Sequence, residues 1–155
     1  MIEVRPITRD AANKAVSAWH RHHKPVRSHR FAIAAYVDDA LRGAVIVGNP
    51  VAPALARDLL CCEVTRLVSD GTPHVASRLL GAAWRAARAM GYRKMVSYTR
   101  ADEDGTCYRA AGWLPVATVE GREWAGVNKP QRWLPGVYVP TTEIVDRTRW
   151  EVTCQ

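Results

Sequence analysis

The stretch DGTPHVASRLLGAAWRAARAMGY, from Asp70 to Tyr92, decides the fold of this chain. It follows LLCCEVTRLVS (59–69), a nearly continuous apolar run that predicts a strand in the middle of a sheet. It precedes RKMVSYT (93–99), a second predicted strand. Between the two, the stretch predicts a loop and then a helix that runs to Met90 and stops at Gly91. This order of strand, helix and strand indicates an α/β domain.

The flanking segments extend the pattern in both directions. IEVRPI (2–7) alternates like a strand, and Thr8 is the predicted N-cap of the helix after it. Residues 30–52 predict a hairpin of two apolar runs around a turn that contains Asp38 and Asp39. The later predicted elements are a short helix in 102–113, a strand in 114–121, a long loop in 122–139 and a last strand in 142–152. The order predicts one α/β domain over residues 1–155, with a mixed, mostly antiparallel sheet flanked by helices.

The composition limits the class of protein. A chain of 155 residues is long enough for one domain with a core of its own. It has no apolar run near the length of a membrane span, and its charged N-terminus predicts a strand and not a signal peptide. The four cysteines lack metal-ligand spacing and are expected to be reduced thiols in a cytoplasmic protein.

The net charge of +7 comes largely from arginine, which makes bidentate contacts with phosphate and carboxylate groups. Such an excess favours an anionic partner, such as a nucleic acid, a nucleotide or a phosphorylated cofactor. A basic surface that only aids solubility explains the same charge equally well, so both interpretations stay open.

The order of elements resembles the GNAT acyltransferase fold over roughly residues 2–119. The motif YRAAGW, with Tyr108, Gly112 and Trp113, is similar to the GNAT helix in which a Tyr is followed by Gly and an aromatic residue. In that family, amides at the start of an earlier helix hold the pyrophosphate of acetyl-CoA. The resemblance implies acetyl-CoA or another acyl donor here, with contacts at Asp70, Gly71, Thr72, His74, Ala76 and Ser77.

The turn before this helix departs from the GNAT pattern of Gln or Arg, two residues, Gly, one residue, and Gly or Ala. Gly71 replaces the basic residue, His74 replaces the first glycine, and only Ala76 fits. The departure weakens the argument for acetyl-CoA as the donor. The N–H groups at the start of a helix still attract an anion, whichever side chains surround them.

The same turn has a second interpretation as an ordinary helix start. Pro73 suits the first turn of a helix, and Asp70 or Thr72 is a candidate cap. A normally capped helix would bind no ligand at this position. The sequence leaves both interpretations open.

Within the GNAT-like proteins, the chain resembles the phage and prophage proteins around the Mom DNA-modification enzyme. The matching residues are His22, His23, Arg66, Asp70, Ser77, Ser97, Tyr98 and Tyr108. The Mom enzyme has an Asp two residues after its Ser-Tyr pair, where this chain has Arg100, with Asp102 and Asp104 nearby. The resemblance implies an enzyme that modifies a DNA base, with Arg66, Ser97 and Tyr98 on the substrate side.

Two residues are candidates for proton transfer. By resemblance, Tyr108 would protonate the departing thiolate of CoA, a role that suits a phenol with a high pKa; the alternative is a tyrosine that packs on the sheet. Glu63 lies in an otherwise apolar strand, where burial would raise its pKa toward that of a general base. The alternative for Glu63 is a salt bridge with Arg66 or another arginine.

The segment HRHHKPVRSH (20–29) contains four of the five histidines. His22 and His23 are candidates for a catalytic base or for a basic lip beside the substrate. His20 and His23 would share a helical face and could also hold a metal, although no carboxylate or cysteine set accompanies them. A solvated helix end is the third interpretation, and no structural zinc site is expected.

The loop from Arg122 to Val139 interleaves tryptophans with basic residues. Trp124 and Arg132 suit a single-stranded or flipped nucleotide, because bases stack on indole rings while Arg meets phosphate. The alternative is that the tryptophans pin the loop to the domain.

The sequence is compatible with three functions. The first is a GNAT-like transferase, of phage origin, that modifies a nucleobase in DNA. The second is an acetyl-CoA-dependent N-acetyltransferase acting on a small amine or a protein. The third is a binding module without catalysis, which the departures in the donor turn would allow.

Overall fold

The computed structural model describes residues 1–19, 24–121 and 145–155. Its elements in chain order are β1 (Glu3–Pro6), α1 (Arg9–Trp19), β2 (Phe31–Val37), β3 (Ala40–Gly48), α2 (Pro53–Ala56), β4 (Cys61–Ser69), α3 (Val75–Ala89), β5 (Lys94–Arg100), α4 (Thr106–Ala110), β6 (Leu114–Val119) and β7 (Arg147–Thr153). None of the helices in these ranges is both long and apolar enough to cross a membrane.

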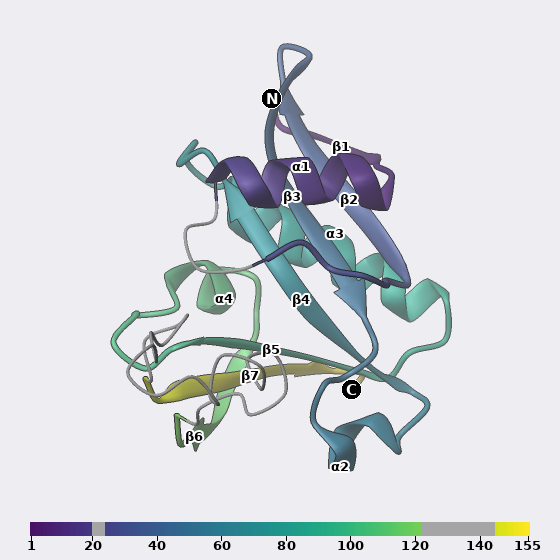
Figure 1. Ribbon diagram of the computed structural model, residues 1–155, viewed down its shortest axis with the longest axis vertical. Coiled ribbons are helices and arrows are strands. Elements are labelled where there is room, and N and C mark those ends of the chain that lie inside the picture. The colour runs from purple at the N-terminus through teal and green to yellow at the C-terminus, as the bar shows by residue number, and fades with distance from the viewer. Residues whose placement is uncertain (20–23, 122–144) are drawn as a thin grey trace, which may run out of the picture.

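The strands form a seven-stranded sheet in the order β1-β2-β3-β4-β5-β7-β6. Among the strands of the described residues, only the β4–β5 pair is parallel, and every other neighbouring pair is antiparallel. Helix α1 lies in front of the sheet in Figure 1 and α3 lies behind it. We call these sides the α1 face and the α3 face. The predicted mixed, mostly antiparallel sheet flanked by helices is confirmed.

Three local features predicted from the sequence are present in the structure. Asp38 and Asp39 both have positive φ, 50° and 61°, as the two-residue turn of the β2–β3 hairpin requires. The Thr8 hydroxyl accepts a hydrogen bond from the Ala11 N–H (3.2 Å), so Thr8 caps α1 as predicted. At the far end of α3, the N–H of Gly91 bonds to the carbonyl of Arg88, which closes the helix where the sequence predicts.

The start of α3 differs from the prediction. The helix begins at Val75, after His74, so Pro73 lies outside its first turn. Asp70 does not cap the helix; its carboxylate accepts hydrogen bonds from the N–H (3.0 Å) and hydroxyl (2.6 Å) of Thr72 and folds the preceding loop instead. His74 occupies the N-cap position, and no side-chain hydrogen bond caps the helix there. The predicted caps are therefore wrong, because the short polar side chains satisfy each other before the helix starts.

Apolar side chains fill both faces of the sheet. On the α1 face, Ala12, Ala15 and Val16 pack on Ile46 and Val68. On the α3 face, a larger core contains the following buried residues, among others: Val64, Val75, Leu79, Leu80, Met95, Tyr108, Trp113 and Trp150. All four cysteines are free thiols. The larger core places Tyr108 beside β5, where the candidate site begins.

Gly105, just before α4, has a φ of +68° and lies against the Trp150 indole. A Cβ at this position would lie 2.7 Å from Cη2 of the ring. We expect Gly105→Ala to lower the free energy of unfolding by roughly 2–5 kcal/mol, from left-handed strain plus overpacking. Gly112→Ala is the matched control, because Gly112 also has positive φ (84°) but open space around it, and should lose only about 1–2 kcal/mol. Chemical denaturation measures both; equal losses would contradict the packing argument.

Candidate functional site

Strands β4 and β5 run parallel for a short distance and then separate. They pair only from Cys61 to Glu63 on β4 and from Lys94 to Val96 on β5, although both strands continue further. Figure 1 shows β4 and β5 diverging, with α4 near the widening end. We call the place where pairing ends, after Glu63 and Val96, the fork. The pairing of β4 with β5 therefore stops partway along an otherwise continuous sheet.

Glu63 lies at the fork on the α1 face. Its neighbours along β4, Cys62 and Val64, belong to the core of the α3 face, so alternation directs Glu63 to the other side. The residue is 5% exposed, and its carboxylate accepts a hydrogen bond from the Val51 N–H (3.4 Å). Burial raises the pKa of Glu63 to about 7, against the opposing effects of that hydrogen bond and of Arg147 and Arg66. A carboxyl with this pKa accepts a proton near neutral pH.

Arg66 approaches Glu63 without forming a salt bridge to it. Among the described residues, Glu63 has no ion pair. The Arg66 guanidinium donates instead to the carbonyls of Lys24 (2.9 Å) and Thr65 (2.6 Å). The predicted alternative for Glu63, a salt bridge with Arg66 or another arginine, is therefore wrong for the part of the chain that the structure covers.

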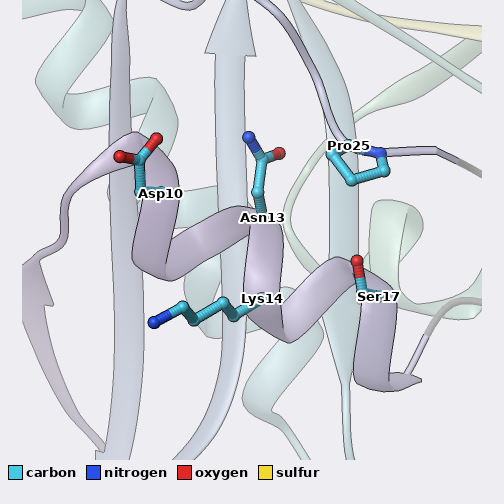
Figure 2. Close-up of a pocket in the computed structure, with 5 residues that line it drawn as sticks. All are labelled: Asp10, Asn13, Lys14, Ser17 and Pro25. Atoms are coloured by element: carbon cyan, nitrogen blue, oxygen red, sulfur yellow. The ribbon is translucent and has the colours of Figure 1, made fainter.

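The segment beginning at Lys24 is held against α1 and the fork. The Asn13 side chain donates to the carbonyl of Val26 (2.9 Å) and accepts from its N–H (2.8 Å). Figure 2 shows Asn13 on the side of α1 that faces this segment, near Pro25, in a shallow pocket. Together with the bond from Arg66 to Lys24, these contacts hold the segment on the α1 face of the sheet, near the fork. The predicted site residues His22 and His23 lie outside the described residues.

On the α3 face of the fork, two hydroxyl groups meet. The Tyr108 and Ser97 hydroxyl oxygens are 2.6 Å apart, and the Ser97 hydroxyl donates to the Val64 carbonyl across the fork (3.5 Å). Tyr108 is 4% exposed, stacks on Trp150 and meets the edge of Trp113. Burial raises the pKa of Tyr108 well above its ordinary value, more than the Ser97 hydrogen bond lowers it. The phenol therefore stays protonated at neutral pH, and its hydroxyl contacts the fork through Ser97.

The turn from Asp70 to Ser77, which we call the donor turn, leads from the end of β4 into α3. The backbone N–H groups of His74, Ala76 and Ser77 have no acceptor among the residues that the structure describes. His74 has a φ of +67°, in the left-handed region that favours glycine. The residue that replaces the first GNAT glycine thus adopts a glycine-like conformation. The turn retains free amides at a helix start, where an anion binds well.

Two arginines that no pattern in the sequence singles out lie on the α1 face of β7. Arg147 and Arg149 alternate with the buried Trp150, and β7 pairs with β5 so that Arg149 lies opposite Tyr98. Burial and the Glu63 carboxylate raise the pKa of Tyr98, while Arg149 and Arg147 oppose that rise. The alternation RTRW is visible in the sequence, but the pairing of β7 with β5 is a long-range contact that no local pattern predicts.

The structure brings most of the predicted site residues to the fork or to the donor turn. At the fork lie Glu63, Arg66, Ser97, Tyr98 and Tyr108. At the donor turn lie Asp70, Gly71, Thr72, His74, Ala76 and Ser77. The predicted nucleotide-binding residues Trp124 and Arg132 lie outside the described residues. In the described ranges, no three His, Cys, Asp or Glu side chains gather as a candidate metal-binding group.

A protein-family model described as the Mom protein family matches residues 1–129. No curated protein matches the chain in sequence. The matched residues include the fork, the donor turn and α4, so the family comparison covers the candidate site.

Solved structures of acetyltransferases share the fold. An acetyltransferase from Bacillus subtilis in complex with CoA has a TM-score of 0.66 at 12% identity, covering 99% of this chain and 98% of that one. The ribosomal-protein-S18-alanine N-acetyltransferase from Escherichia coli has a TM-score of 0.66 at 9% identity, with 99% and 94% covered. An acetyltransferase of the GNAT family from Streptococcus pneumoniae has a TM-score of 0.65 at 12% identity, with 99% and 100% covered. The chain therefore has the fold of the GNAT acetyltransferases.

Proposed function

This chain belongs to the Mom protein family, and from that premise we propose that it is a GNAT-type transferase that moves an acyl group to a nucleobase of DNA. The observation that carries the proposal is the fork, with a carboxyl group of pKa about 7 on one face and a protonated hydroxyl pair on the other. In acyl transfer from a thioester to an amine, one group can take the proton that the attacking nitrogen loses and another can give a proton to the leaving sulfur. The fork supplies both.

The acceptor nitrogen attacks the thioester carbonyl carbon, forming a C–N bond, and the C–S bond breaks. Glu63, as the carboxylate, takes the proton that the nitrogen loses, directly or through one water molecule. The leaving sulfur takes a proton from Ser97, which takes one from Tyr108 through the 2.6 Å contact. After the products leave, Glu63 releases its proton to solvent and Tyr108 regains one from solvent.

The donor turn fits the diphosphate of an acyl-CoA. Three free backbone N–H groups and the start of a 15-residue helix provide hydrogen-bond donors and a positive dipole end. His74 adopts its left-handed conformation without a side-chain cap, which leaves these groups available. The donor would then extend from the turn toward the fork, because the turn directly follows β4.

The charge of the α1 face favours an anionic acceptor. Arg66, Arg147 and Arg149 lie on this face around Glu63 and Tyr98. Arginine side chains beside a tyrosine ring suit a nucleotide, because the cations meet phosphate while the ring stacks on a base. The net charge of +7 and membership in the Mom family support the same choice. A small amine or a protein remains the alternative acceptor.

The test combines binding and product analysis. The purified protein is titrated with acetyl-CoA by calorimetry, then incubated with labelled acetyl-CoA and single-stranded or duplex DNA. The DNA is digested to nucleosides and analysed by mass spectrometry. We expect micromolar acetyl-CoA binding and a labelled nucleoside whose yield falls as salt rises, since phosphate contacts are salt-sensitive.

The outcomes separate the candidate functions. Acetyl-CoA binding with label on an added polyamine or protein, and none on DNA, would favour the small-amine or protein acetyltransferase. DNA binding without acetyl-CoA binding would mean that another donor occupies the turn. Binding of both acetyl-CoA and an acceptor without any product would leave a binding module and overturn the transferase proposal.

A further inference from the structure

The chain between β3 and β4, residues 49–60, is longer than the pairing of these strands requires. The two strands are antiparallel, so a short turn could join them. The chain instead forms α2 and a turn on either side of it, and these extend below the sheet in Figure 1. We call residues 49–60 the β3–β4 connection. Connections at the surface of a rigid sheet frequently carry binding residues.

The β3–β4 connection exposes large apolar side chains. Leu59 is 86% exposed, Val51 54% and Leu60 46%, and Pro53 at the start of α2 is exposed as well. In the described ranges, none of these four side chains belongs to either core of the sheet. They therefore contribute little to folding. Several large apolar side chains exposed on one connection indicate a contact surface.

Hydrogen bonds fix the backbone around the two leucines. The Leu60 N–H donates to the Asp58 carboxylate (2.9 Å), and the Cys61 N–H donates to the Asp58 carbonyl (3.1 Å). The Leu60 carbonyl accepts from the N–H groups of Arg93 (2.8 Å) and Lys94 (3.2 Å) at the start of β5. A fixed backbone thus presents the leucines to solvent, which lowers the entropy cost of placing them in a partner.

The same connection contacts the proposed general base. The Val51 N–H donates to the Glu63 carboxylate (3.4 Å), so the exposed Val51 lies beside the fork on the α1 face. At the other end of the connection, Leu59 is separated from Glu63 by at most about 14 Å of extended backbone. The major groove of DNA is about 12 Å wide. The apolar side chains are therefore within reach of DNA whose acceptor base lies at Glu63.

Two cations flank the exposed leucines. Arg57 precedes them on the connection, and Arg93 is bonded through its N–H to the Leu60 carbonyl. Both arginines are exposed, and neither forms an ion pair in the part of the chain that the structure describes. Apolar side chains between free arginines are complementary to DNA, because arginine binds phosphates while leucine enters between base steps. The charge therefore favours DNA over an uncharged apolar partner.

We propose that the β3–β4 connection is a wedge that enters duplex DNA beside the acceptor base, with Leu59 and Leu60 in the space that the base leaves. The inference rests on the proposed function, since a base inside a duplex must leave the stack before its nitrogen can reach the fork. Apolar wedges unstack neighbouring base pairs and hold the duplex open. Arg57 and Arg93 would bind the phosphates beside the gap.

A wedge is required for duplex DNA but not for single strands, whose bases are already accessible. The test measures kcat/KM for transfer of label from acetyl-CoA to single-stranded and to duplex DNA of the same sequence. In Leu59→Ser, kcat/KM for the duplex should fall about 10-fold, because the opened stack is no longer filled. The value for the single strand should be little changed.

The matched control is Leu114→Ser, which makes the same change at a leucine that is 67% exposed on β6, at the edge of the sheet. It should keep the wild-type ratio of duplex to single-strand kcat/KM. Circular dichroism and thermal melting verify that both variants fold, and analytical ultracentrifugation gives their oligomeric state.

Four results would overturn the wedge. Three of them leave the transferase in place: a wild-type ratio in Leu59→Ser, an equal fall on both forms of DNA, or label on single strands alone by the wild type. A wild-type dimer that Leu59→Ser converts to a monomer would show that a second copy of this chain covers the leucines. Absence of label on both forms of DNA with the wild type would instead overturn the proposed function, and the wedge with it.

Discussion

Glu63→Gln is expected to lower kcat/KM of acyl transfer by about 10²–10⁴-fold, the usual contribution of a general base. In the wild type, kcat/KM should rise with pH and level off above about 7, because Glu63 accepts a proton only when ionised. Glutamine cannot accept that proton, so the variant should show a low rate without this rise. Thiol release from acetyl-CoA in the presence of acceptor, measured across pH, provides the profile.

The same substitution has an effect on stability that needs no substrate. The pKa of Glu63 is about 7 in the folded protein, against an ordinary value of 4.5. Between these values the folded state holds a proton that the unfolded state has released, so the free energy of unfolding falls as pH rises through this window. The full difference corresponds to roughly 3 kcal/mol. Glu63→Gln lacks the titrating group and should lose this part of the pH dependence.

Urea denaturation at about pH 5 and about pH 8 measures that effect, and Glu120→Gln, at an exposed position, is the control. The control should follow the wild type at both values. Glu63→Gln should gain stability relative to the wild type at the higher pH. A constant difference between Glu63→Gln and the wild type at both pH values would show that the buried carboxyl does not titrate in this range.

The sequence predicts the fold well because the strong signals are local. The Asp38–Asp39 turn and the Thr8 cap each depend on a few neighbouring residues, and the structure confirms both. The strand predicted over 59–69 is present but begins at Cys61. The resemblance to GNAT proteins also favours a mixed, mostly antiparallel sheet. Element order alone does not specify that β7 inserts between β5 and β6, because this pairing joins residues far apart in the chain.

The candidate site is less predictable for the same reason. Glu63 stands out as a carboxylate in an apolar strand, but the groups that act on its pKa include the Val51 N–H, from the connection after β3, and Arg147 on β7. The donor turn is hard to predict for a different reason. Its residues depart from the GNAT pattern, yet His74 adopts a positive φ, so the backbone keeps a feature that the side chains do not reveal.

Tyr108→Phe is expected to lower kcat for acyl transfer by about 10²–10⁴-fold, if the phenol provides the proton for the leaving sulfur. The phenyl ring keeps the stacking on Trp150 and the edge contact with Trp113, so the core should remain packed. The lost hydroxyl leaves Ser97 with the longer bond to the Val64 carbonyl. The stability cost should therefore be only about 1 kcal/mol, far less than the effect on rate.

Ser97→Ala distinguishes a relay from direct proton donation. Because Tyr108 is buried and contacts the fork through Ser97, a relay requires both hydroxyls, and Ser97→Ala should lose about as much activity as Tyr108→Phe. The double variant should then be no slower than either single variant, since groups acting as a unit are not additive. Tyr36→Phe is the control, because that ring lies on β2 beside Arg5 and should leave the rate unchanged. Full activity in Tyr108→Phe would remove the phenol from the reaction, whereas loss in Tyr108→Phe alone would mean that it donates directly.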